Sequence, residues 1–128
     1  MDFSKVTNKK YVRYFLSVDE SSINAEIMNE FINEMIECSK SLDNSKISSP
    51  TEIVKEIKSR LGLNGGVYGI ITQIASSDLI NSLSSLEIFT LLWFVSCKNA
   101  FGFEEGVYYN MAINKTIGNL LKNLSFHQ

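Results

Sequence analysis

The chain has 128 residues, of which 45% are hydrophobic and 20% are charged, and its formal net charge is −2. This composition is typical of one globular domain large enough to bury a core, and it excludes disordered and collagen-like chains. The near-neutral charge argues against a uniformly basic nucleic-acid binder and against a strongly acidic tail.

The cysteines and the histidine do not form a ligand pattern. Cys38 and Cys97 are far apart, and His127, the one histidine, is the second-last residue. Zinc sites and disulfide frameworks need closely spaced sets of such residues, so we expect two buried free thiols, no metal and no cofactor. The N-terminus has no apolar signal segment, and the apolar run 88–97 is too short to span a bilayer. The sequence therefore predicts a cytoplasmic protein with no membrane partner.

Two amphipathic helices are expected in the first third of the chain. Apolar residues recur at spacings of three and four over about residues 8–18, next to the basic residues Lys9, Lys10 and Arg13. The same spacing continues over about residues 22–42, where Ile27, Phe31 and Met35 share one face. The second of these helices has the clearest periodicity in the sequence.

The middle of the chain contains strong helix-start and helix-stop signals. Ser49, Pro50 and Glu52 fit the first positions of a third helix, and Gly62 fits its C-terminal end. A flexible joint, Asn64-Gly65-Gly66, follows. Residues 67–76 and 78–83 read as helical pieces, although the β-branched stretch 67–71 also leaves a strand open.

Two further helices are expected in the last third. Ser84 and Glu87 form a capping-box pattern that opens an almost wholly apolar helix over about residues 86–99. Glu104 and Glu105 favour the start of the last helix, which is expected to end near Asn123. Strand alternation is weak, so we predict a single all-α domain over residues 1–128, a compact bundle of about five to seven helices.

Acidic residues are concentrated around the second helix. Residues 19–43 contain seven acids and one base, whereas the N-terminal segment is basic, so the chain is electrically polarised along its sequence. Glu residues four apart form one line on a helix. The acids of this segment that we take as candidate partner-binding residues are Asp19, Glu20, Glu26, Glu30, Glu34 and Glu37.

Three interpretations of this acidic line remain open. The first is a solvated helix face. The second is a surface that pairs with basic residues, either on a helix of the same chain or on a cationic partner. The third is a carboxylate site that binds metal or takes part in catalysis. The metal interpretation lacks the Glu-x-x-His motifs of di-metal bundles. The chain also lacks a P-loop and a nucleophile elbow, so we expect a protein that is not an enzyme.

Aromatic residues give a second candidate surface. Tyr108 and Tyr109 follow Phe101 and Phe103 near the start of the last helix, and they are either core residues or anchors of an interface. Tyr11 and Tyr14 alternate with the N-terminal basic residues, a pattern that can stack on bases. Nucleic acid is nevertheless an unexpected partner for a net acidic chain.

In size, in its acidic segment from Asp19 to Glu37 and in its lack of catalytic residues, the chain resembles the bacterial immunity proteins that neutralise toxins, including those of contact-dependent growth inhibition. The resemblance implies a tight one-to-one complex with a cognate protein toxin, often a basic nuclease. The alternatives are a homo-oligomeric structural or regulatory domain that associates through residues 86–103, and a small-molecule-binding or enzymatic domain with a pocket that the sequence does not reveal.

Overall fold

The computed structural model describes residues 2–17, 24–40, 50–97 and 107–126, without the side chains of residues 68 and 107–112. These ranges contain six α-helices, one 3-10 helix and no strand, which confirms the all-α prediction. The elements are α1 (Lys9–Ser17), α2 (Ala25–Lys40), α3 (Pro50–Leu61), α4 (Val67–Ala75), η1 (Asp78–Ser82), α5 (Ser85–Ser96) and α6 (Val107–Phe126).

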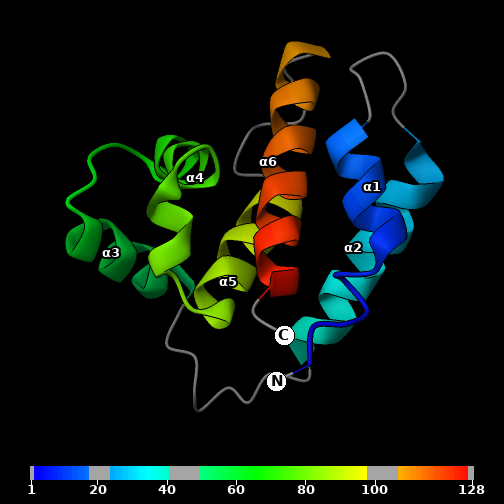
Figure 1. The fold of residues 1–128 in the computed structure, drawn as a ribbon, viewed down its shortest axis with the longest axis horizontal. Coiled ribbons are helices and arrows are strands. Elements are labelled where there is room, and N and C mark those ends of the chain that lie inside the picture. The colour runs from blue at the N-terminus through cyan, green and yellow to red at the C-terminus, as the bar shows by residue number, and fades with distance from the viewer. Residues whose placement is uncertain (1, 18–23, 41–49, 98–106, 127–128) are drawn as a thin grey trace.

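Helix α6 is the centre of the arrangement. Figure 1 shows α1 and α2 as an antiparallel pair on one side of α6, with α3 and α4 on the other side. Helices α1 and α5 make the most extensive contacts with α6, and α3 packs on α5. The N-terminal pair and the α3–α4 pair therefore sit on opposite sides of the molecule.

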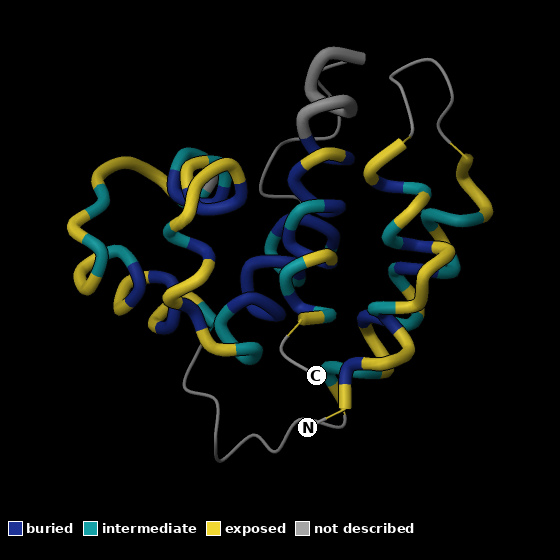
Figure 2. The backbone as a smooth tube through the Cα atoms, in the orientation of Figure 1, coloured by how far each residue is buried: buried dark blue, intermediate teal, exposed yellow. Residues whose placement is uncertain are grey.

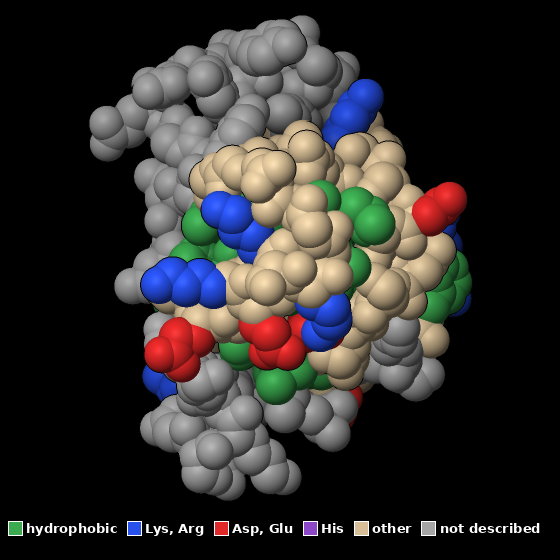
Figure 3. Space-filling view, turned by 90° about the vertical axis from the view of Figure 1, so that its left-hand side faces the viewer, with side chains coloured by type: hydrophobic (Ala, Val, Ile, Leu, Met, Phe, Trp, Pro, Cys, Tyr) green, Lys and Arg blue, Asp and Glu red, His purple; other side chains and the backbone are tan. Residues whose placement is uncertain are grey.

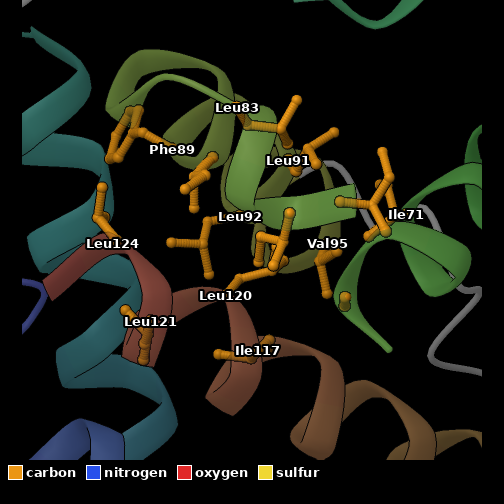
Figure 4. Packing of buried hydrophobic residues seen from close by; sticks show 14 of the residues in the cluster. Ile71, Leu83, Phe89, Leu91, Leu92, Val95, Ile117, Leu120, Leu121 and Leu124 are labelled. Carbon is orange, nitrogen blue, oxygen red and sulfur yellow. The ribbon is translucent and has the colours of Figure 1, made fainter. Parts of the chain in front are cut away.

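The largest part of the core lies between α5 and α6. Side chains from α4, α5 and α6 converge there, as Figure 4 shows for Ile71, Leu92, Val95 and Leu120. Helix α5 is apolar on almost every side, and seven of its twelve residues are buried. A helix of this composition is stable only inside a protein, because each of its faces needs apolar contacts.

The outer helices bury one face each, as the alternation of buried and exposed backbone in Figure 2 shows. In α2 the fully buried side chains are Phe31 and Met35, which are four residues apart. In α1 they are Tyr11 and Phe15, again four apart. The spacing of apolar residues that the sequence analysis used therefore identifies the buried faces of α1 and α2.

Local sequence signals set several helix ends. Helix α3 starts at Pro50 and ends at Leu61, and Gly62 follows with φ of 65°, as a C-terminal glycine should. Ser84 and Glu87 form the predicted capping box of α5. Residues 67–71 are helical, which answers the open choice between strand and helix there.

Some predicted bounds were wrong. The second helix begins at Ala25 and not near residue 22, because Asn24 caps it through hydrogen bonds from the N–H groups of Glu26 and Ile27. Its predicted end near residue 42 lies outside the described residues. Helix α6 continues past the predicted end at Asn123 to Phe126. The expected helix start at residues 104–105 and the predicted cap at residue 49 lie outside the described residues.

The thiols differ from the prediction that both are buried. Cys38 and Cys97 are half-buried, and burial raises the pKa of each. Across the described ranges, no helix combines the length and the apolar character needed to cross a membrane.

Candidate partner-binding surface on α2

Helix α2 is fixed to the molecule through an aromatic cluster. The ring of Phe31 lies 5.4 Å from that of Tyr11 and 4.9 Å from that of Phe15, both in edge-to-face geometry. Such pairs stabilise a contact beyond the area that they bury. Because these rings and Met35 lie on one side of α2, the opposite side faces solvent.

The outward side of α2 is mostly polar. One apolar residue, Ile36, is 38% exposed there, next to Glu37. An exposed aliphatic side chain among polar ones is common on protein surfaces and does not by itself mark an interface. The exposed residues of α2 from Glu26 onward are Glu26, Asn29, Asn33, Ile36, Glu37 and Lys40.

The predicted acidic line is divided between this outward side and the flank toward α1. Glu26 and Glu37 are exposed, whereas Glu30 and Glu34 are half-buried. Lys10 Nζ donates a hydrogen bond to Glu30 Oε2 at 2.8 Å, and this bond raises the pKa of Lys10. The carboxylate of Glu37 pairs with Lys40 at 3.3 Å.

The opposite charges predicted for the N-terminal part are therefore neighbours in space. Helices α1 and α2 together carry four basic and four acidic side chains, a net formal charge of zero. The charges that are separated along the sequence are therefore not separated in space, because the basic side of α1 lies next to the acidic flank of α2. This pairing is one of the explanations that the sequence left open for the acidic line.

Four of the candidate residues cannot be placed on this surface. Asp19 and Glu20 lie outside the described residues, and so do Phe101, Phe103, Glu104 and Glu105. Tyr108 and Tyr109 belong to α6, but their side chains are not described. Their role as core residues or interface anchors stays a prediction.

The aromatic residues of α1 are not arranged for stacking on bases. Tyr11 is buried, with 4% of its surface exposed. The hydroxyl of Tyr14 accepts a hydrogen bond from the Asn24 N–H at 2.6 Å, which ties α1 to the start of α2. Base stacking requires an accessible ring face, which the buried Tyr11 lacks and the half-buried Tyr14 offers only in part.

Most of the described part of α5 packs into the core, and self-association through residues 86–103 stays a prediction. The buried side chains of α5 fill the core, and its half-buried residues Leu86, Trp93 and Phe94 pack against the same core. The rest of the predicted self-association segment, residues 98–103, lies outside the described ranges.

A hollow of about 290 Å³ lies between α4, η1 and α6. Small-molecule sites are mostly apolar and enclosed, but this hollow is open, and its wall is mostly polar. Among the described residues, no group of three or more His, Cys, Asp or Glu is close enough to hold a metal ion. The polar and charged residues at the hollow are Ser76, Ser77, Asp78, Asn81, Asn119, Lys122 and Asn123.

The face of the molecule formed by α3 and α4 differs from the α2 flank. Figure 3 shows Lys and Arg side chains next to Asp and Glu on this face, without a patch of one sign. Arg60 is an example, because it lies 3.7 Å from Glu56 and 2.9 Å from Glu87. Carboxylates on this face can therefore serve as controls for substitutions of the carboxylates on α2.

No family model, no curated protein and no solved structure matches this chain.

Sequence reasoning left open that the acidic line pairs with the basic N-terminal helix, but it did not identify the ion pair between Lys10 and Glu30. The order of the elements did indicate that these two helices are neighbours, because the basic and the acidic helix are consecutive and a short connection favours antiparallel packing. The helical phase that turns Lys10 toward Glu30 depends on how Tyr11 and Phe31 pack, which the sequence pattern does not specify.

Proposed function

We propose that the chain is an immunity protein that binds a cognate cationic toxin domain, such as a basic nuclease, and neutralises it in the bacterial cytoplasm. The observation that carries the proposal is the line of carboxylates on α2, which extends from Glu26 to Glu37 over about three helical turns. Asp19 and Glu20 would extend the acidic surface, and Tyr108 and Tyr109 would provide apolar anchors.

The placement of the carboxylates supports this proposal. They project from a helix that Phe31 and Met35 fix by burial, so little conformational entropy is lost when a partner binds. Glu26 and Glu37, at the two ends of the line, are the most accessible to a partner. Complementary charge on a toxin would speed association and exclude partners of the wrong sign.

The first experiment is to express the chain with the protein encoded by the neighbouring gene and to isolate the complex. We expect a one-to-one complex in which the toxicity of the neighbour is lost. Absence of any stoichiometric protein partner in the native host would contradict the proposal.

The second experiment locates the surface with a matched pair of variants. Glu26→Lys with Glu37→Lys should weaken the complex by at least about tenfold, whereas Glu52→Lys with Glu56→Lys on α3 should change its dissociation constant little. Each pair reverses one first-turn carboxylate and one carboxylate with an ion-pair partner on its own helix. Glu30 is left unchanged because its loss would also disturb the contact with α1. Equal weakening by both pairs would show that net charge, and not the α2 surface, controls binding.

A further inference from the structure

The joint between α3 and α4 contains the one Asn-Gly sequence in the chain, Asn64-Gly65. Both residues are exposed, and Gly65 has φ of 112°. A Cβ placed on Gly65 would have no neighbouring atom within 4 Å, so the space around this residue is open. Neither the Asn64 side chain nor the Gly65 N–H makes a hydrogen bond with the described residues.

Other described asparagines are held by local structure. The side-chain oxygen of Asn8 accepts from the Lys10 N–H at 3.0 Å, and that of Asn24 accepts from the N–H of Glu26 at 3.0 Å. Inside a helix, the backbone nitrogen that follows an asparagine is held by the helical geometry. The described asparagines within helices are Asn29, Asn33, Asn81, Asn110, Asn114, Asn119 and Asn123.

We infer that Asn64 is a site of spontaneous deamidation. Asparagine is a thermolabile residue, and a following glycine has no Cβ to hinder attack by its backbone nitrogen. Hydroxide removes the Gly65 amide proton, and the nitrogen attacks Asn64 Cγ. The side-chain nitrogen takes a proton from water and leaves as ammonia, which regenerates hydroxide and completes a succinimide ring. Water then opens one of the two carbonyl–nitrogen bonds of the ring, and the product is aspartate or isoaspartate.

The product changes the joint in two ways. The new carboxylate makes the chain one unit more negative and lies near Lys58, whose Nζ donates to the Gly65 carbonyl at 3.1 Å. In isoaspartate the backbone runs through the former side chain, which adds a methylene group between α3 and α4. The modification therefore acts on the connection between these two helices and not on α2.

The test is to incubate the folded chain in mildly alkaline buffer at physiological temperature for several days, with the chain unfolded in urea as the reference. Isoelectric focusing and peptide mass spectrometry follow the charge and the position of the product. We expect a shift of one negative charge, mapped to position 64, at a rate within about tenfold of the unfolded chain, because an exposed loop needs almost no local opening. Asn64→Gln should lose the shift, and Asn81→Gln should retain it.

Two results would overturn the inference. One is a folded chain that keeps its charge while the unfolded chain deamidates, since the fold would then protect Asn64. The other is a modification that maps to a different asparagine and persists in Asn64→Gln. Neither result depends on whether the chain binds a toxin, so this inference and the proposed function can fail separately.

Discussion

Two helical glycines differ in what surrounds them. A Cβ on Gly118 of α6 would lie 2.8 Å from Leu16 Cδ2 and 3.0 Å from the Leu16 backbone nitrogen, whereas a Cβ on Gly69 of α4 would meet nothing within 4 Å. Gly118 therefore lets the backbone of α1 approach α6 closely. The end of α1 is therefore positioned by the absence of a side chain at residue 118.

We predict opposite effects of alanine at these two glycines. Gly118→Ala should lower the free energy of unfolding by about 1–2 kcal/mol, because overpacking against a backbone atom outweighs the gain in helix propensity. Gly69→Ala should raise it by about 0.5 kcal/mol or more, because only the propensity changes. Urea unfolding followed by circular dichroism measures both. If the two variants were equally stable, α1 and α6 would not be in close backbone contact.

At the scale of elements, Glu87 connects two helices. Its carboxylate accepts from the Ser84 N–H at 2.9 Å within the capping box of α5 and from Arg60 of α3 at 2.9 Å. Burial alone would raise the pKa of Glu87, but the hydrogen bonds from Arg60 and Ser84 outweigh burial, so the pKa is below its usual value. The ionised form is therefore the one that the folded state favours.

This shift predicts an acid-sensitive contact between α3 and α5. A carboxyl group whose pKa is lower in the folded than in the unfolded state stabilises the fold above its unfolded pKa, and this stability is lost as the pH falls through the folded value. Glu87→Gln should cost up to about 1 kcal/mol at neutral pH, because it removes the charge that pairs with Arg60 while glutamine can still complete the capping box. The difference from the unmodified chain should shrink below the ordinary carboxyl pKa of about 4.5. Urea unfolding at a series of pH values measures it, and a difference that stays constant into acid would contradict the prediction. Glu56→Gln, which leaves the contact between Arg60 and the Glu87 carboxylate in place, is the control.

The helix ends that could be predicted are those set by neighbours in sequence. Pro50, Gly62 and the Ser84–Glu87 box act through local hydrogen bonds and backbone preference, so their patterns were sufficient. The start of α2 was missed because the apolar spacing extends back to Ile23, beyond the cap that Asn24 forms. Residues 67–71 remained ambiguous because β-branched side chains suit a strand and a buried helix alike.

At the scale of the whole molecule, the spacing of the carboxylates on α2 could be predicted, but the charges beside them could not. The line from Glu26 to Glu37 follows from helical spacing alone. That Lys10 neutralises Glu30 depends on which faces of α1 and α2 meet, and this is set by the packing of Tyr11 and Phe31. The field available to a partner is therefore weaker than the seven acids of the segment suggest.

The cations of α1 consequently oppose the proposed association. Lys9 and Arg13 are exposed, and neither has an ion-pair partner among the described residues, so Lys9→Gln with Arg13→Gln should leave the Lys10–Glu30 pair intact. The variant should associate with the cationic toxin domain a few times faster at low ionic strength. The gain should disappear near 1 M salt, where charges are screened within about 3 Å. Lys55→Gln with Lys115→Gln, which removes the same charge from α3 and α6, controls for net charge and should give a smaller gain. Stopped-flow measurements across a salt series test this. Slower association of the Lys9 and Arg13 variant would mean that these cations contact the partner, as they would if the partner were nucleic acid.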